Sequence, residues 1–295
     1  MTEHTPVATV ELNLDELKGH VGRRAESTDV VTAAPANLLR LAFGRPEHEF
    51  RDGDVLPPGW QILYFLPRYR QEELRPDGTP IDAGIVPSMP LPRRMFAGDR
   101  FRFVAPIHIG ETLRRETELT DISIKTGATG TLVFATTVNR ISGPHGLAVE
   151  EERRTVFREE VRPGEQNQAP RREAAPTDTP WRRTVRPDSV LLFRFSALTF
   201  NSHRIHYDRP WAMQTEGYPG LVVHGPLTST LLIDFARDHS RARTLRTYTT
   251  QARAPLFDTA PFELRGRPTT DGGGTELWVV TPEGTVAMSA RVEFG

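Results

Sequence analysis

The two parts of this chain end in the same way, and this repetition constrains the fold more than any other feature. Residues 131–157 form an alternating run, a turn with Pro and Gly, and a second alternating run, as two paired strands do. Residues 276–294 repeat that order. Upstream, VAPIHIGETLRR at 104–115 echoes RAPLFDTAPFELR at 253–265. An internal duplication of one sheet-forming unit explains why these features recur in the same order.

A Pro-rich segment separates the two parts. Residues 161–186 read VRPGEQNQAPRREAAPTDTPWRRTVR, which is polar and charged and has no apolar period. Such a composition is typical of a linker. The sequence therefore predicts an N-terminal half at residues 1–160 and a C-terminal half at 187–295, each of the size of a domain.

Each half also offers an apolar helix ahead of its strands. In the C-terminal half the helix is predicted to begin at Gly225, because Pro226 follows and leucines recur at helical spacing. The N-terminal half has two candidates, residues 36–43 and 60–66, and the second is preferred because the LPPGW that opens it resembles VVHGP. A long antiparallel sheet around one helix is a hot-dog unit. The expected fold is α+β, a double hot-dog of two antiparallel sheets, each wrapped around a central helix.

One stretch, FSALTFNSHRIHYDRPWA at 195–212, gathers side chains that can bind or move protons. Five of them fall within eight residues: Asn201, His203, His206, Tyr207 and Asp208. A histidine with a pKa of about 6.5 can take up or return a proton at neutral pH. An asparagine can orient a water molecule and hold the histidine without titrating. The stretch therefore predicts an acid/base site in a loop between ordered elements.

The start of the C-terminal helix supplies a second requirement of the same chemistry. In LVVHGPL at 221–227, the Gly225 N–H is expected to be an unpaired donor at the positive end of the helix dipole. Addition of water to an α,β-unsaturated thioester needs such a donor, because negative charge develops on the thioester oxygen in the enolate. The histidine and the glycine together predict hydration or dehydration of an acyl thioester.

These motifs resemble those of the MaoC-like hydratases and dehydratases, among them type 2 3-hydroxyacyl-thioester dehydratases and mesaconyl- and itaconyl-CoA hydratases. Asn201, His206 and Asp208 match the spacing of the family's hydratase motif, and HGPL matches the glycine at the start of its hot-dog helix. PLPRRMFAGDRFRF at 90–103 and KTGATGTLVF at 125–134 resemble the N-terminal half of the type 2 branch.

The resemblance covers about residues 25–294 and implies roles for particular residues. The catalytic residues would be His206, Asn201 and Gly225. The N-terminal half lacks the catalytic motif and would bind the substrate and its CoA. Candidates for substrate binding are Arg93, Arg94, Arg204, Tyr207, Asp208, His203, His224 and Arg253. The arginines are included because phosphates and carboxylates favour bidentate donors. His203 is expected to orient the loop more than to react, and His224 to shape the turn.

One departure from the family pattern concerns Asn201, which stands where the usual motif has an acid. An amide cannot act as a general acid or base. Either His206 carries out both proton transfers, or a second carboxylate such as Asp208 or Glu216 assists it. The version with a single histidine is preferred.

Composition excludes several classes of protein. With 37 basic and 38 acidic side chains the net charge is -1, so no global field favours nucleic acid or an anionic membrane. The chain has no cysteine, which excludes thiolate metal sites and disulfides. No signal peptide or membrane helix is evident. We expect a cytoplasmic homodimer without a metal or cofactor.

Three functions remain open at this point. The first is hydration of an acyl-CoA, preferably a short branched dicarboxylic one of the mesaconyl-C4-CoA or itaconyl-CoA type. The second is dehydration of a 3-hydroxyacyl thioester of acyl carrier protein in fatty acid synthesis. The third is a non-catalytic thioester-binding subunit, which the missing acid would allow. A thioesterase is disfavoured because its reaction does not call for the pattern of Asn201 and His206.

Overall fold

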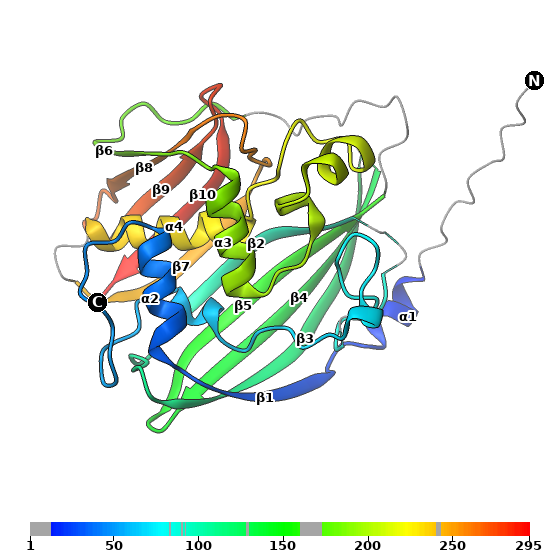
Figure 1. Cartoon of the computed structure of the whole chain (residues 1–295), viewed down its shortest axis with the longest axis horizontal. Coiled ribbons are helices and arrows are strands. Elements are labelled where there is room, and N and C mark those ends of the chain that lie inside the picture. Colours follow the sequence, from blue (N-terminus) through cyan, green and yellow to red (C-terminus); the bar gives the residue numbers. More distant parts are fainter. Residues whose placement is uncertain are drawn as a thin grey trace, which may run out of the picture.

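The computed structural model describes residues 13–82, 84–89, 91, 93–127, 130–159, 173–239 and 243–295. Within them, ten strands form one antiparallel sheet in the order β1-β3-β4-β5-β2-β7-β10-β9-β8-β6, and helices cover one of its faces (Figure 1). The strands of the N-terminal half are β1 (Arg24–Val30), β2 (Arg93–Phe103), β3 (Thr112–Gly127), β4 (Gly130–Gly143) and β5 (Gly146–Arg158). Those of the C-terminal half are β6 (Trp181–Val185), β7 (Leu245–Ala252), β8 (Phe262–Pro268), β9 (Gly274–Val280) and β10 (Val286–Phe294).

The strand order shows the internal duplication directly. Read from its outer edge, the N-terminal half runs β1-β3-β4-β5-β2, and the C-terminal half runs β6-β8-β9-β10-β7. Each strand of one half therefore has a counterpart at the same place in the other. The two sequence echoes occupy matching places, because Ala105 donates its N–H to the Ala148 carbonyl, and Ala254 donates to the Ala287 carbonyl. The halves meet where β2 pairs with β7. The two sheets expected from the sequence are thus joined edge to edge into one.

The predicted linker is partly ordered. Residues 161–172 lie outside the described residues, whereas Trp181–Val185, which the sequence analysis assigns to the linker, forms β6 and pairs with β8 along its whole length. This strand is short, lies at the sheet edge and carries Arg182 and Arg183. Charged residues on a short edge strand are common because they discourage pairing with other chains. The same charges hide the strand in the sequence.

The helices differ between the halves. Four α-helices are described: α1 (Leu14–Lys18), α2 (Ala33–Ala42), α3 (Ser189–Thr199) and α4 (Gly225–Asp238). Short turns of other helix types are η1 (Trp60–Leu63), η2 (Gln71–Glu73), η3 (Arg204–His206) and η4 (Trp211–Thr215). The predicted helix of the C-terminal half is confirmed as α4, which packs on β7, β8 and β9 and is buried from Leu227 to Ala236.

The preferred helix of the N-terminal half is wrong in extent but occupies the expected place. Leu56 donates its N–H to the Ile107 carbonyl at 2.8 Å, just as Val223 donates to the Leu256 carbonyl at 2.8 Å in the other half. However, η1 ends after four residues, and the next residue, Tyr64, is extended. The longer helix is α2, which overlaps the rejected candidate and lies beside α3 (Figure 1).

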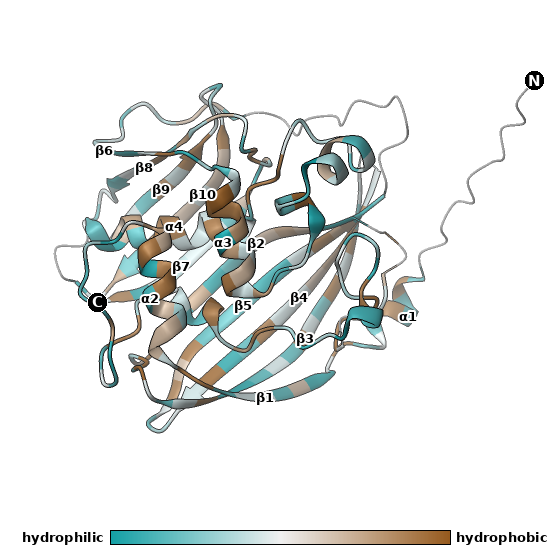
Figure 2. Ribbon diagram, in the orientation of Figure 1, coloured by the Kyte–Doolittle hydropathy of each residue, from teal (hydrophilic) through white to brown (hydrophobic). Residues whose placement is uncertain are grey.

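Apolar side chains hold the helices against the sheet. One large cluster surrounds α4 and includes Trp60, Phe195 and Tyr248, and a smaller one lies under α1 around Leu119 and Val133. In Figure 2 the brown apolar residues follow α3, α4 and alternate positions of the strands. No helix in the described part of the chain has both the length and the apolar character needed to cross a membrane.

Candidate active site

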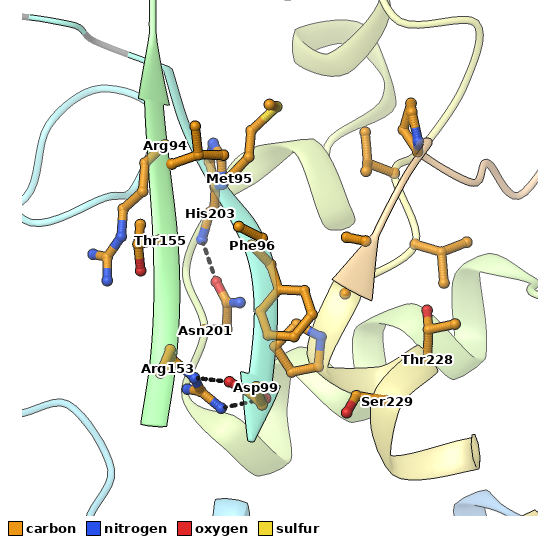
Figure 3. A pocket seen from close by; sticks show the side chains of 18 of the residues that line it. Arg94, Met95, Phe96, Asp99, Arg153, Thr155, Asn201, His203, Thr228 and Ser229 are labelled. Carbon is orange, nitrogen blue, oxygen red and sulfur yellow. Dashed lines mark hydrogen bonds and ion pairs between the residues drawn. The ribbon is translucent and has the colours of Figure 1, made fainter. Parts of the chain in front are cut away.

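A cavity of about 1380 Å³ lies between the two halves. Residues from β2 and β5 of the N-terminal half line it, together with the loop after α3 and the beginning of α4 (Figure 3). Among the residues predicted to act, those lining the cavity are Asn201, His203, His206, Gly225, Arg93, Arg94 and Arg253.

The loop that bears the histidines is fixed from both sides. Phe200 at the end of α3 adopts a left-handed conformation with φ 48°, which turns the chain sharply toward the cavity. From the N-terminal half, the Gly78 carbonyl accepts a hydrogen bond from Ser202 Oγ at 2.6 Å. A Cβ on Gly78 would lie 1.8 Å from the Ser202 carbonyl oxygen, so only glycine allows this approach. The catalytic loop is therefore held by residues of the other half.

His206 is buried, and its hydrogen bond determines which ring nitrogen can react. Nδ1 lies 2.7 Å from the Val222 carbonyl oxygen, which can only accept, so Nδ1 carries the proton. Nε2 is left as the basic nitrogen of a residue that lines the cavity. Burial, and to a smaller extent the neighbouring His203, lower the pKa of His206 to about 3 against the opposing effect of the Val222 carbonyl. The imidazole is therefore neutral at pH 7 and able to accept a proton.

Two further histidines pack around His206. The His224 ring stacks on the His206 ring with centroids 3.7 Å apart, and His224 Nε2 lies 2.9 Å from Ser196 Oγ. Burial keeps the pKa of His224 well below its usual value. The His203 ring meets His206 edge to face at 5.6 Å, and burial lowers the pKa of His203 to about 4. His224 does not line the cavity, and its ring packs against that of His206. That His224 shapes the turn stays a prediction.

Asn201 lies at the cavity and presents its amide to it. Its Oδ1 accepts a hydrogen bond from the His203 N–H at 3.0 Å (Figure 3). Its own N–H donates to the Ser196 carbonyl at 2.8 Å, which anchors the backbone. The Nδ2 group has no protein partner among the described residues and can donate to a water molecule or to substrate.

The start of α4 has the features of an oxyanion site. His224 is the N-cap and makes no side-chain capping bond, and in the described residues the Gly225 N–H has no protein acceptor. A Cβ on Gly225 would lie 2.6 Å from Phe96 Cδ1, so the absence of a side chain makes room for Phe96. Phe96 borders a bulge that shifts the register of β2 before Gly98. Bulges often aim side chains into active sites, and this one directs Phe96 at the helix start.

Four predicted residues do not line the cavity, and one of them is His224. The other three lie on the far side of η3. Arg204 pairs with Asp208 at 2.6 Å and its guanidinium lies 3.9 Å from the centre of the Trp211 ring. Tyr207 is exposed and donates to the Ser202 carbonyl at 2.9 Å. Spacing in the sequence could not separate these residues from His206, because a single 3₁₀ turn directs them to opposite sides.

Neither proposed second carboxylate is placed as a free acid beside His206. Asp208 caps the Trp211 N–H, and this bond together with Arg204 lowers the pKa of Asp208. Glu216 lies near Asp77 and His203, and one potential ligand atom from each falls within 4.8 Å of the others. These three form the group of described side chains that could hold a metal ion. That the protein uses no metal stays a prediction.

The sequence analysis missed a set of charged residues on the N-terminal side of the cavity. Asp99 is buried and pairs with Arg153 at 2.9 Å, and Arg153 also pairs with Glu151 at 2.7 Å (Figure 3). Burial raises the pKa of Asp99 to about 6, against the lowering effect of Arg153. A signal was available, because Glu151 and Arg153 alternate with the inward Phe157 in a predicted strand.

Comparison with known proteins identifies the family. The family model for hydroxyacyl-thioester dehydratase type 2 matches residues 59–258. The chain belongs to this family. It is therefore a member of a hydro-lyase family acting on acyl thioesters, as the sequence predicted.

Relatives of this chain include the mesaconyl-C(4)-CoA hydratase of Chloroflexus aurantiacus, which is 45% identical over 276 residues, covering 93% of this chain and 96% of that protein. A MaoC-like dehydratase from Phytophthora capsici has a similar fold, with a TM-score of 0.69, 14% identity, and coverage of 96% of this chain and 99% of that one. A Mycobacterium tuberculosis protein described as a double hot-dog gives a TM-score of 0.54 at 13% identity, covering 95% and 97%. The predicted double hot-dog fold is confirmed.

Proposed function

We propose that this enzyme catalyses the reversible hydration of an α,β-unsaturated acyl thioester, with a short branched dicarboxylic enoyl-CoA of the mesaconyl-C4-CoA or itaconyl-CoA type as substrate. The observation that supports this most is the neutral His206, whose basic Nε2 belongs to the same cavity as the unpaired Gly225 N–H. The 45% identity to a mesaconyl-C(4)-CoA hydratase supports the choice of substrate.

In the hydration direction, His206 removes a proton from water as the water oxygen attacks the β-carbon of the substrate. The electron pair of the double bond moves to the α-carbon and the thioester oxygen, where the Gly225 N–H and the α4 dipole stabilise the enolate. The imidazolium of His206 then returns the proton to the α-carbon, so one water molecule is added in all. Asn201 Nδ2 donates to the water oxygen and holds its lone pair toward the β-carbon.

A single acid/base fits the surroundings of His206. The amide of Asn201 cannot titrate, and within the described part of the chain the Asp208 carboxylate bonds to Arg204 and the Trp211 N–H. A neutral imidazole can accept the proton and return it without a second group. Positioned acid/base groups of this kind contribute about 10²- to 10⁴-fold in rate.

Arginines at the cavity favour CoA as the carrier. Arg93 and Arg158 are paired across β2 and β5, so their guanidinium groups extend on the same face. Burial, and next the charge of Arg93, lower the pKa of Arg158. Both line the cavity together with Arg253. Neighbouring cations repel each other unless an anion lies between them, and the phosphates of CoA would supply it.

The test is an assay of the purified enzyme on a panel of thioesters. Mesaconyl-C4-CoA, itaconyl-CoA, crotonyl-CoA and crotonyl-acyl carrier protein are offered, and the loss of enoyl absorbance gives kcat/KM for each. We expect the two dicarboxylic CoA esters to be preferred. A higher kcat/KM for the carrier-protein thioester would favour a dehydratase of fatty acid synthesis. Binding without turnover of any thioester would favour a non-catalytic subunit.

We also propose a cytoplasmic homodimer. The adjacent helices α2 and α3 expose four large apolar side chains: Leu38, Leu41, Val190 and Phe193. Because α2 and α3 follow matching strands of the two halves, the patch is close to symmetric, which suits a twofold interface between copies. Sedimentation of the wild type and of Leu41→Asp tests this, since a monomer in both would contradict the dimer. The absence of cysteine is compatible with a reducing compartment.

A further inference from the structure

Arg94 lies on the active-site side of β2. In the pairing of β2 with β5, Arg94 faces Phe157 and Phe96 faces Thr155, so Arg94 and Phe96 extend from the same face of the sheet. Phe96 contacts the start of α4, where the thioester oxygen is proposed to bind. Arg94 therefore lies two residues along the strand from the residue that contacts the helix start. Figure 3 shows Arg94 on the same strand as Phe96, with Asn201 and His203 on the loop nearby.

The arginines on this side of the cavity are of two kinds. Arg153 is neutralised by ion pairs with Asp99 and Glu151. Arg94 and Arg115 have no ion pair or hydrogen bond within the described part of the chain. The Arg115 guanidinium carbon lies 4.8 Å from the centre of the Phe65 ring, and its Nε is buried without a partner. The carboxylates of Glu151 and Asp29 lie within the field of its charge.

The two arginines differ in exposure, because Arg94 is exposed and Arg115 is half-buried. Burial lowers the pKa of Arg94 and of Arg115, although both remain charged at neutral pH. The Tyr69 side chain lies within the field of both guanidinium groups and supplies a polar hydroxyl. A guanidinium group that faces a cavity without a protein partner can bind an anion through its planar donors. Because the Arg94 side chain is accessible within the cavity, that anion can be part of a ligand.

The position of Arg94 restricts which part of the ligand it can bind. The charge of Arg94 acts on His203, whose ring centre lies 5.6 Å from that of His206. Arg94 is also two residues along β2 from Phe96, which contacts the start of α4, so an anion at Arg94 would lie near the acyl group of a thioester bound there. CoA phosphates are separated from the acyl group by the long pantetheine arm, so they cannot occupy this place when the thioester is at Gly225.

We propose that Arg94 binds a free carboxylate on the acyl chain of the substrate, with Arg115 and Tyr69 completing the subsite, so that the enzyme selects unsaturated acyl-CoA esters whose β-carbon bears a carboxylate. This inference rests on the proposed hydration function. The planar guanidinium can form two parallel hydrogen bonds to a carboxylate and thereby fix the β-carbon against His206. Arg94 is in this view a specificity residue that binds the substrate and takes no part in proton transfer.

The experiment compares two substrates of the same shape. Mesaconyl-C4-CoA carries a methyl group and a carboxylate on its β-carbon, and 3-methylcrotonyl-CoA carries two methyl groups. The ratio of their kcat/KM values is measured for the wild type, Arg94→Gln, Arg94→Lys and Arg100→Gln. Arg100 serves as the control because it lies on the same strand, is exposed and does not line the cavity.

We expect Arg94→Gln to lower the ratio by on the order of 10², mainly through KM of the dicarboxylic ester. Arg94→Lys should recover part of the loss, and Arg100→Gln should leave the ratio unchanged. Arg115→Gln should lower it less, since Arg115 lies farther from the reacting carbon. If the wild type hydrates both esters equally, or Arg94→Gln slows both by the same factor, the carboxylate site is wrong while hydration stands.

If the wild type hydrates neither ester, the proposed function is wrong. The carboxylate subsite at Arg94 is then tested by calorimetry, which measures the binding of both esters to the wild type and to Arg94→Gln. Tighter binding of the dicarboxylic ester that depends on Arg94 would support the subsite. Equal binding of the two esters to both proteins would overturn it.

Discussion

The two halves of the molecule share one strand order but fill their inner faces differently. In the C-terminal half, the 14-residue helix α4 covers the strands with a nearly continuous apolar surface. In the N-terminal half the matching place holds the four-residue turn η1. The space that a second central helix would take remains open as part of the cavity. Loss of one helix from a duplicated unit thus converts a packed core into a binding site.

The polar residues follow the same division. On the C-terminal side, the reactive loop and the start of α4 bring together His206, Asn201 and Gly225. On the N-terminal side, strands β2, β3 and β5 place arginines and carboxylates at inward positions that an apolar core would otherwise occupy. In the proposed mechanism one half therefore supplies the proton transfer and the oxyanion donor, and the other supplies charges that can recognise the acyl chain.

The division between the halves is tested most severely by His206→Gln. We expect kcat/KM to fall by about 10²- to 10⁴-fold, because glutamine can hydrogen-bond to the Val222 carbonyl but cannot accept a proton. The fold should persist, as shown by an unchanged cooperative thermal transition. The matched control is His145→Gln, at an exposed turn of the N-terminal half, which should retain full activity. Near-wild-type turnover by His206→Gln would place the acid/base elsewhere.

The next largest effect compares the glycines at the starts of α4 and η1. Gly225→Val should lower kcat/KM by on the order of 10², because the new side chain displaces Phe96 and blocks the thioester from the helix N–H. Gly59→Val should mainly lower stability, because Gly59 has φ 89° and a Cβ there would lie 2.8 Å from Ile233 Cδ1. Activity and thermal midpoint are measured for both variants. If Gly225→Val hydrates substrate at the wild-type rate, the thioester oxygen binds at another place.

Much of the C-terminal half could be predicted from sequence, because its determinants are local. Pro226 at the first turn and leucines at helical spacing specify α4, and Asn201 and His206 lie five residues apart on one loop. The internal duplication can also be recognised in the sequence, because an Ala-Pro pair recurs at 105–106 and 254–255. In the structure the two alanines make matching backbone hydrogen bonds. Where a structural element depends on residues close together in sequence, the apolar period and the spacing of polar residues are enough to predict it.

The N-terminal half could not be predicted as well, because its determinants are distant in sequence. The η1 turn is anchored through Trp60, whose Nε1 donates to Asp234 of α4 at 3.1 Å, and no local pattern reveals a partner in the other half. Likewise, Asp99 and Arg153 become a buried pair only when β2 and β5 align. Arg204 was expected at the substrate because the sequence could not show its pairing with Asp208.

A smaller effect contrasts the acid response of the two halves. The pKa values of His203 and His206 are lowered to about 4 and about 3, and that of His224 is lowered as well. Below about pH 6.5 the unfolded chain therefore binds more protons at these sites than the folded one, so stability falls as pH falls. Each histidine can change the unfolding equilibrium by up to about tenfold per pH unit.

Asp99 acts in the opposite direction. Its pKa is raised to about 6, so between about pH 4 and 6 the folded state binds the extra proton, and acid favours folding at this site. Three histidines against one carboxyl predict a net loss of stability from pH 7 to pH 5. Urea unfolding at both pH values measures it. His206→Gln should reduce the loss and Asp99→Asn should increase it, and equal slopes in all three proteins would contradict the assignment.

The smallest effect is expected from Asn201→Asp. Asn201 Oδ1 accepts a hydrogen bond from the His203 backbone N–H. A carboxylate oxygen can accept the same bond, so the loop should keep its shape. The introduced charge falls near the unpaired Arg94, which also acts on His203, and it restores the acid found at this spacing in the wider family. We expect kcat/KM of Asn201→Asp to stay within about fivefold of the wild type or to rise. Asn201→Ala loses a hydrogen bond to water, and its kcat/KM should fall by about tenfold.

The dependence of kcat/KM on pH distinguishes an aspartate that only positions water from one that transfers a proton. An aspartate at 201 that transfers a proton would add a decrease of kcat/KM at low pH that the wild type lacks. Equal activity of the wild type, Asn201→Asp and Asn201→Ala would show that the side chain at 201 does not orient water, and His206 would then act with no help from its own loop.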